Sequence, residues 1–428
     1  MVLDAENSIW QQLSLSDMTY VCSISEYNLP EFESCLKRKP KYLVMIVSRF
    51  HKAQAAADRF ARVVADAIPG VQVIRPDQTG REFDGTDLAD FQSWLREVLL
   101  PQLEQLPASY RVCNITGGTK MMAMALLTAN LGWSWLEYKA EGANALQLIG
   151  FRNGNLAGIN STDLEVASPV DVARLYSEHV HQTSENMIFM HPKSVYQAQK
   201  LWDALQSHEP TLLGLFGDEN KGLEKIWMYG ASQDQFNQKQ LSMSASEFVG
   251  QEQFSTEQMQ WLELWSELSP SSFKASNDQL ILPGNKDRRD PLRRWLSGDW
   301  LEQLAHAWLC TSIPAKHICM NVRVRPENEN NSSLGERESD ILVHFKGRTS
   351  IIEAKTDLPP GQKITDSIRQ LASITERFGR TTKVLFIGPQ LKQKHEDKLE
   401  ELKLRCRAEG IFLAFDKDSL LQAVLKSE

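Results

Sequence analysis

The chain has 428 residues, enough for two or three domains, and its apolar fraction of 42% is typical of proteins with ordinary buried cores. No stretch approaches the run of about 18 apolar residues that spans a membrane, and residues 1–6 are acidic, unlike a secretory signal peptide. The six cysteines form no C-x-x-C pair and the nine histidines form no ligand cluster, so the sequence indicates neither a zinc site nor a disulfide framework. We therefore expect a cytoplasmic protein with no membrane partner.

The net charge of −8 is unevenly distributed along the chain. Residues 284–428 carry 25 Lys and Arg against 21 Asp and Glu, which is +4, and residues 1–283 hold the remaining 22 and 34, which is −12. A basic C-terminal part suits a polyanionic substrate such as nucleic acid. An excess this small is equally compatible with surface charge that has no role.

Residues 1–164 alternate apolar, strand-like runs with helical patterns. Continuous apolar strands between helices favour a parallel sheet with both faces covered. The sequence therefore predicts a Rossmann-like α/β domain over residues 1–164. The predicted strands are 19–25, 41–48, 71–74 and 111–115, and the predicted helices are 53–68, 87–103 and 118–131.

The segment NITGGTKMM, residues 114–122, lies where a predicted strand ends and a helix begins. Its paired glycines allow backbone N–H groups to approach a phosphate, and a helix N-terminus favours anions. The threonines add hydroxyl groups and the lysine adds positive charge, although the spacing is not that of a Walker A loop. The same residues also suit a tight turn with Thr119 as the helix N-cap. Physical reasoning alone leaves both interpretations open.

This loop resembles the signature loop of CRISPR-associated Rossmann-fold (CARF) domains, and residues 25–32 resemble the second ligand loop of that family. Such domains dimerise and bind cyclic oligoadenylate across the two-fold axis. The resemblance implies phosphate and ribose contacts from the first loop, base or ribose contacts from the second, and added contacts after the second strand. The residues so implied are, in that order, Thr116, Gly117, Gly118, Thr119 and Lys120; Ser25 and Asn28; and Ser48 and Arg49.

Residues 165–283 are predicted to link this domain to a C-terminal one. Helical patterns cover residues 191–205 and the segment that follows Ser255. In the second of these, Trp261, Trp265 and their leucine neighbours recur at helical spacing, which indicates a core-facing side rather than a base-stacking platform. A small winged-helix-like module and a plain helical connector remain equally compatible with this pattern.

Two apolar runs near the C-terminus each deliver an acid at a strand end, namely Asp340 and Glu353. Residues two apart on a strand share a face, so Lys355 lies beside Glu353, and Asp340 can meet them from the other strand of a hairpin. Facing carboxylates repel unless a cation lies between them, and Mg²⁺ or Mn²⁺ prefers such oxygen ligands. A lysine beside the cation can activate water and stabilise charge on a phosphate.

The order of elements around these residues resembles the PD-(D/E)XK nuclease superfamily over about residues 290–428. A helix carrying Glu302 precedes the acidic strands, and a helix carrying Gln370 and a buried strand at 383–388 follow them. Ser339 replaces the proline of the superfamily's name. The resemblance implies an α/β nuclease domain over residues 284–428, in which Asp340, Glu353 and Glu302 hold Mg²⁺ or Mn²⁺. It further implies that Lys355 activates water and that Gln370 orients the substrate or the nucleophile.

A CARF domain ahead of a PD-(D/E)XK domain resembles the ancillary nucleases of type III CRISPR systems. This resemblance implies a homodimeric, metal-dependent nuclease that is activated by cyclic oligoadenylate, with cyclic tetra-adenylate favoured, and that cleaves DNA or RNA in antiviral defence. One alternative is a ring nuclease, in which Thr116 and Lys120 position a ribose 2′-OH against the activator's own phosphate. Another is a non-enzymatic regulator whose middle region binds DNA.

Overall fold

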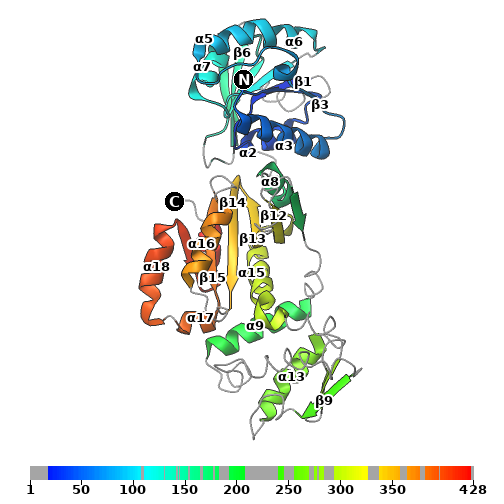
Figure 1. The fold of residues 1–428 in the computed structure, drawn as a ribbon, viewed down its shortest axis with the longest axis vertical. Helices are drawn as coiled ribbons and strands as arrows, with labels where there is room; N and C mark the ends of the chain where they lie inside the picture. Colours follow the sequence, from blue (N-terminus) through cyan, green and yellow to red (C-terminus); the bar gives the residue numbers. More distant parts are fainter. Residues whose placement is uncertain are drawn as a thin grey trace, which may run out of the picture.

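The computed structural model describes residues 18–107, 110–129, 131–140, 143, 145–152, 155–163, 167–176, 179–182, 192–207, 240–244, 255–268, 274–276, 279–283, 294–325, 337–356, 364–375, 381–394 and 396–425. Figure 1 shows an elongated molecule with a seven-stranded sheet unit at one end, a six-stranded sheet unit in the middle, and a small three-stranded sheet at the other end. We call the first two the N-terminal unit and the C-terminal unit.

The N-terminal unit contains a sheet of order β3-β2-β1-β4-β5-β6-β7, in which β1 to β5 are parallel and β6 and β7 form an antiparallel extension. Its strands are β1 (Met18–Ser23), β2 (Tyr42–Ile46), β3 (Gln72–Ile74), β4 (Tyr110–Asn114), β5 (Trp135–Tyr138), β6 (Ala145–Arg152) and β7 (Asn155–Asp163). Its helices are α2 (Leu29–Arg38), α3 (His51–Ala67), α4 (Pro76–Thr79), α5 (Leu88–Trp94), α6 (Leu100–Gln105) and α7 (Lys120–Thr128), with a π-helical turn at Leu95–Leu99.

Helices cover both faces of this sheet, because the buried strands alternate their side chains between two cores. Tyr20 and Cys22 of β1 pack with α2 and α3, whereas Val21 points to the opposite core with Trp94 and Leu126. This confirms the predicted Rossmann-like parallel sheet. The β6–β7 hairpin extends the sheet beyond the predicted strands.

The C-terminal unit contains a sheet of order β16-β15-β14-β13-β12-β8, in which the β13–β14 pair is antiparallel and β14 to β16 are parallel. Its strands are β8 (His179–Gln182), β12 (Ile318–Arg325), β13 (Arg337–Phe345), β14 (Arg348–Lys355), β15 (Thr381–Ile387) and β16 (Ile411–Ala414). Its helices are α8 (Pro169–Tyr176), α9 (Pro192–Gln206), α15 (Trp300–Cys310), α16 (Ile364–Thr375), α17 (Pro389–Lys394), α18 (Leu399–Ala408) and α19 (Lys417–Leu425), with single turns at Trp295–Asp299, Ala315–His317 and Glu396–Lys398.

Part of the predicted linker packs in this unit. The strand β8 pairs antiparallel with β12, and α9 contributes Leu201 and Trp202 to the core that contains α15. The helix α8 contributes Leu175 to the core of the N-terminal unit and Ala173 to a core under β12–β14. The helix α8 is therefore a packed junction between the two units.

The small sheet, of order β10-β11-β9, is antiparallel and contacts α13 (Thr256–Leu268). Its strands are β9 (Gln240–Ser244), β10 (Lys274–Ser276) and β11 (Gln279–Pro283). Trp265 of α13 is buried in the same core as α15 and Trp261 packs against that core, so the predicted core role of these aromatic residues is confirmed. Leu262, which was not predicted, is buried there as well. The rest of the region that decides between a winged helix and a connector, residues 208–239 and 245–254, lies outside the described residues.

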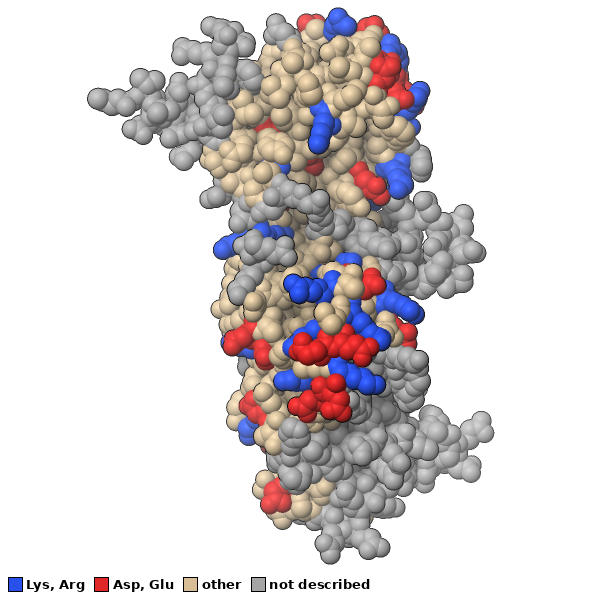
Figure 2. Space-filling model, turned by 90° about the vertical axis from the view of Figure 1, so that its left-hand side faces the viewer, with Lys and Arg blue, Asp and Glu red and all other residues tan. Residues whose placement is uncertain are grey.

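Within the described part of the chain, no helix is long and apolar enough to cross a bilayer. Figure 2 shows the face that looks toward the left of Figure 1, where Lys and Arg alternate with Asp and Glu over the C-terminal unit. On α18, which lies on that side of Figure 1, Lys403 pairs with Glu400 and Arg405 with Glu401. This face therefore presents paired charges rather than a continuous positive surface.

Candidate functional site

The β13–β14 hairpin brings Asp340, Glu353 and Lys355 together. In the antiparallel register Ile341 faces Ile352, so the next pair outward is Asp340 and Glu353. The Asp340 Oδ2 atom accepts a hydrogen bond of 2.7 Å from the Ala354 N–H, and the Lys355 Nζ lies 2.6 Å from Glu353 Oε1. Glu353 is 2% exposed, and its second carboxylate oxygen is buried with no hydrogen-bond partner among the described residues.

The electrostatics of this cluster show crowded negative charge. Burial, together with the charge of Glu353, raises the pKa of Asp340 to about 8, against the opposing effects of Lys355 and the Ala354 N–H. Burial alone would lower the pKa of Lys355, but attraction to Asp340 and Glu353 raises it instead. Such crowding, with one orphaned oxygen, is the environment that a divalent cation relieves. The residues present therefore fit a Mg²⁺ or Mn²⁺ site.

Glu302, the first-turn acid of α15, lies close enough to Asp340 for the two charges to interact. Burial, then the charges of Asp340 and Asp299, raises its pKa well above the usual range. Asp299 is three residues earlier, so it shares a helix face with Glu302, and burial raises its pKa to about 6. Asp299 was not predicted as a site residue, although its i, i+3 spacing from Glu302 is a usable signal.

The acids form a pair rather than a complete set of cation ligands. In the described ranges, no group of three or more His, Cys, Asp or Glu side chains is arranged to hold a metal ion. The structure thus presents a carboxylate pair with Glu302 nearby rather than a completed cage. Gln370 lies on an exposed part of α16, and no contact among the described residues joins it to the acids. Its role in orienting substrate stays a prediction.

The second candidate site lies at the carboxyl ends of β1 and β4. These strands are adjacent and parallel, and the strand order runs outward in opposite directions from them. Such a switch point is where open α/β sheets bind ligands, because the loops diverge there. The loop after β1 carries Ser25 and Asn28, and the loop after β4 carries residues 116–120. Both predicted ligand loops therefore meet at one edge of the sheet.

Both glycines of the β4 loop are structurally required. A Cβ on Gly117 would lie 2.3 Å from the Ser23 carbonyl oxygen, and Gly118 has a φ of +79°. Thr119 caps α7, since its hydroxyl accepts a hydrogen bond from the Met122 N–H and donates one to the Gly85 carbonyl. The predicted N-cap is confirmed. Lys120 begins the helix and is exposed, and its role in binding phosphate stays a prediction.

Ser25 and Asn28 hold the β1 loop closed. The Asn28 side chain accepts from the Ser25 N–H and donates to the Ser25 carbonyl, each at 2.8 Å, and Asn28 is 3% exposed. The Ser25 hydroxyl donates to the Tyr27 carbonyl. The structure therefore places Asn28 where it shapes the loop, with Ser25 and Tyr27 closer to the surface.

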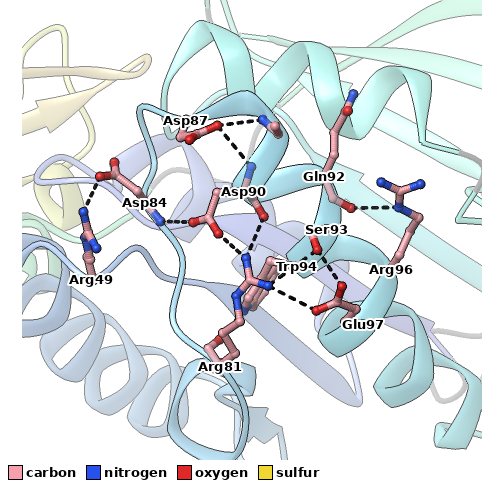
Figure 3. Close-up of polar contacts among 11 residues, drawn as sticks. Arg49, Arg81, Asp84, Asp87, Asp90, Gln92, Ser93, Trp94, Arg96 and Glu97 are labelled. Carbon is pink, nitrogen blue, oxygen red and sulfur yellow. Dashed lines mark hydrogen bonds and ion pairs between the residues drawn. The ribbon is translucent and has the colours of Figure 1, made fainter.

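Ser48 and Arg49 follow β2. Ser48 is buried beside Gly85, whereas Arg49 is exposed and pairs with Asp84. Figure 3 shows that Asp84 belongs to a polar network that continues through Asp90 to Arg81. Because Thr119 also bonds to Gly85, this network fixes the segment that borders the β4 loop.

Glu31 of α2 lies beneath the β4 loop and was not predicted as a site residue. It is fully buried, one of its oxygens would be 2.9 Å from a Cβ on Gly117, and neither oxygen has a hydrogen-bond partner in the part of the chain that is described. Burial raises the pKa of Glu31 to about 8, only partly offset by nearby backbone N–H groups and Lys139. The folded protein therefore holds this carboxyl protonated at neutral pH.

Glu31→Gln is expected to stabilise the protein increasingly as the pH rises from about 5 to above 8. A carboxyl whose pKa is raised by folding contributes stability below its unfolded pKa, about 4.3, and loses it as the pH rises through its folded pKa. Glutamine mimics the protonated acid at every pH, so the gain in Tm over the wild type should grow across this window. A difference in Tm between Glu31→Gln and the wild type that does not change with pH contradicts the assignment of Glu31 as a buried, protonated carboxyl.

Comparison with known proteins identifies the fold. No protein-family model matches the chain, and no curated protein sequence matches it. Protein VC1899 from Vibrio cholerae aligns with a TM-score of 0.64 at 16% identity, covering 95% of this chain and 96% of its own. Can2 from Sulfobacillus thermosulfidooxidans, solved with cyclic tetra-adenylate, aligns with a TM-score of 0.61 at 16% identity, covering 95% and 98%. The chain therefore shares one fold with these proteins across both units, which confirms the predicted fold class.

Proposed function

We propose that the chain is a homodimeric, metal-dependent nuclease that cyclic oligoadenylate activates in type III CRISPR antiviral defence. The observation that carries this proposal is the Asp340, Glu353 and Lys355 cluster on the β13–β14 hairpin, with its orphaned buried oxygen. The shared fold with a protein solved with cyclic tetra-adenylate favours that ring as the activator. This function accounts for both candidate sites, the acids of the β13–β14 hairpin and the loops after β1 and β4.

In the C-terminal unit, Asp340 and Glu353 would hold Mg²⁺ or Mn²⁺, with Glu302 as support. When bound, the cation supplies Lewis-acid activation of a phosphodiester and a lowered pKa for water. Glu353 keeps the Lys355 ammonium group beside the acids, where it can attract the phosphate and stabilise the negative charge that develops during hydrolysis. Glu353 is buried, so little water reaches its carboxylate, and its electrostatic interactions are stronger than they would be in bulk water.

In the N-terminal unit, two copies of the β1 and β4 loops would form one pocket around a two-fold axis. A ring with four or six repeats matches such an axis, and a ring of three does not. The helix α7 starts at the β4 loop and exposes Met121, Met124 and Leu127, which are spaced three residues apart. Large apolar side chains exposed together suit burial against a second copy. The proposed dimer surface therefore adjoins the proposed ring site.

The direct test is a cleavage assay with Mn²⁺ or Mg²⁺ on single- and double-stranded DNA and RNA, in the presence of rings of three, four or six adenylates. We expect the four-membered ring to give the largest increase in rate. Activity that is independent of every ring contradicts the proposed sensing. Degradation of the cyclic oligoadenylate, without cleavage of the added DNA or RNA, supports the ring-nuclease alternative.

Lys120→Ala is expected to weaken ring binding by about tenfold or more. A charge-assisted hydrogen bond to phosphate contributes about 1.5–3 kcal/mol, and Lys120 lies exposed at a helix N-terminus. Titration calorimetry measures the loss directly, and the activation midpoint should shift by the same factor.

Lys41→Ala is the matched control, because Lys41 is also exposed but precedes β2, at the opposite end of the parallel strands. Its affinity for the ring should stay at the wild-type value. Equal losses in both variants indicate a general charge effect, and an unchanged affinity in Lys120→Ala removes this residue from the site.

A further inference from the structure

A buried polar contact joins the two units. The Glu33 Oε1 atom of α2 lies 3.0 Å from Nε2 of His344 in β13, and both side chains have zero exposure. Figure 1 shows α2 on the side of the N-terminal unit that faces the β13–β14 hairpin. Because a carboxylate only accepts, the His344 Nε2–H must donate. A buried contact of this kind is costly unless every member is satisfied, so its geometry is closely specified.

On the ligand side, this contact continues to the β4 loop. The other oxygen of Glu33 lies 2.7 Å from the Lys139 Nζ, and the Lys139 backbone N–H donates to the Thr116 hydroxyl at 2.9 Å. Burial alone would raise the pKa of Glu33, but the hydrogen bond from His344 and the charge of Lys139 lower it. The ionised Glu33 carboxylate therefore contacts both His344 of the hairpin and Lys139, whose backbone N–H donates to Thr116 of the proposed ring site.

Helix α2 itself is bound to the same loops. It starts directly after Asn28, which closes the β1 loop, and its Glu31 packs against Gly117 of the β4 loop. A movement of either loop on binding a ring must therefore be accommodated by α2. Glu33 lies half a turn from Glu31 on this helix.

On the nuclease side, the contact continues into the strands that carry the acids. The His344 Nδ1 atom lies 3.0 Å from the Thr349 hydroxyl, and these residues face each other across the hairpin. His344 is four residues from Asp340, and Thr349 is four residues from Glu353, so all four side chains lie on one face. About 14 Å of strand separates the two pairs. A tilt of the hairpin at His344 would therefore change the position of the acids.

A second contact also connects the β1 loop to the elements that pack on the hairpin. The Tyr27 ring of the β1 loop lies 6.0 Å from the Tyr176 ring of α8. Ala173, one turn earlier in α8, is buried with Leu342 of β13 and Ile351 of β14. Both ligand loops thus contact elements that pack on the same hairpin.

We propose that the Glu33–His344 contact couples ring binding in the N-terminal unit to the position of the β13–β14 hairpin, and so controls cleavage. This inference rests on the proposed function. The ring can shift an equilibrium between an inactive and an active state only if it binds the two states with different affinities. The Glu33–His344 contact must therefore differ between these two states. A ring that binds the Thr116–Lys120 loop changes the environment of Thr116 and Lys139, and Glu33 passes the change to His344. The two residues are positioning residues and touch neither the ring nor the cleaved phosphate.

The test uses the full-length dimer with His344→Leu and Thr349→Val. The first removes the contact between the units, and the second removes only the hydroxyl that joins His344 to β14. The measurements are ring affinity by calorimetry, cleavage rate with no ring and at saturating ring, and hydrogen exchange of the hairpin with and without ring. We expect ring affinity within about threefold of the wild type. The ratio of ring-stimulated to basal cleavage should fall at least about tenfold in His344→Leu, and less in Thr349→Val.

Ser350→Ala is the matched control. Ser350 is 2% exposed and follows Thr349 in β14, so its hydroxyl lies on the opposite face of the sheet. Its stimulation ratio should equal that of the wild type. If His344→Leu does not fold, Thr349→Val carries the test alone, since valine keeps the shape of threonine.

Three outcomes overturn this inference alone. The first is an unchanged stimulation ratio in the folded variants, and the second is an equal loss in Ser350→Ala. The third is a wild type whose hairpin exchange does not respond to ring. Hydrogen exchange separates this failure from that of the proposed function. If the ring changes hairpin exchange in the wild type and changes it less in Thr349→Val, the coupling holds even where no nucleic acid is cut. A wild type that binds no ring overturns both.

Discussion

Glu353→Gln is expected to lower the cleavage rate by about a thousandfold or more, which corresponds to about 4 kcal/mol of barrier, and to leave ring binding unchanged. Glutamine keeps the shape of the side chain but lacks the charge that a divalent cation requires. It also loses the ion pair of 2.6 Å that places Lys355 beside the acids. Two functions of the site therefore fail together. Single-turnover cleavage at saturating ring measures the effect, and calorimetry checks the ring.

The matched control is Glu338→Gln. Glu338 lies on β13, two residues before Asp340, but it forms an ion pair with Arg323 of β12. Its negative charge contributes to the field at Asp340 without belonging to the predicted site. A loss of only a few fold is expected there. Cleavage by Glu353→Gln at the wild-type rate, or an equal loss in both variants, contradicts the assignment of Glu353 as a cation ligand.

The hairpin acids could be predicted because their signal is local. The period of two along a strand places Glu353 and Lys355 on one face, and a short hairpin returns Asp340 to them. Likewise, the β4 loop is recognisable because only glycine fits at Gly117, where a Cβ would meet the backbone of β1. Local geometry and local composition agree at both places, so a pattern read from the sequence is sufficient.

Glu33 and His344 could not be predicted, because 311 residues separate them and neither is part of a local motif. The acid Glu31 occupies an ordinary first-turn helix position and Glu33 lies two residues later, and a solvated role is the usual expectation for both. Only the packing of α2 between the β4 loop and the hairpin buries them. In the same way, β8 has no local pattern that assigns it to the C-terminal sheet, since its partner strand β12 begins more than 130 residues later.

The second large effect is expected from a substitution on the exposed face of α7. Met124→Glu should convert the proposed dimer to monomers and remove the proposed ring-dependent activation. Met124 is 64% exposed, and it lies between Met121 and Leu127 on the helix that begins at the β4 loop. A glutamate placed in an apolar interface without a partner costs several kcal/mol, so the dimer should weaken by roughly a hundredfold or more. A monomer presents only half of a two-fold pocket, so ring affinity should fall with the dimer.

Analytical ultracentrifugation measures the mass, and titration calorimetry should give one ring per wild-type dimer. Leu404→Glu is the control, because Leu404 is 66% exposed on α18 of the C-terminal unit and receives the same charge. It should remain dimeric and fully activated. A Met124→Glu protein that stays dimeric removes α7 from the interface. One ring bound per monomer, or stronger activation by the three-membered ring, contradicts the two-fold pocket, because neither agrees with a single ring shared by two identical loops.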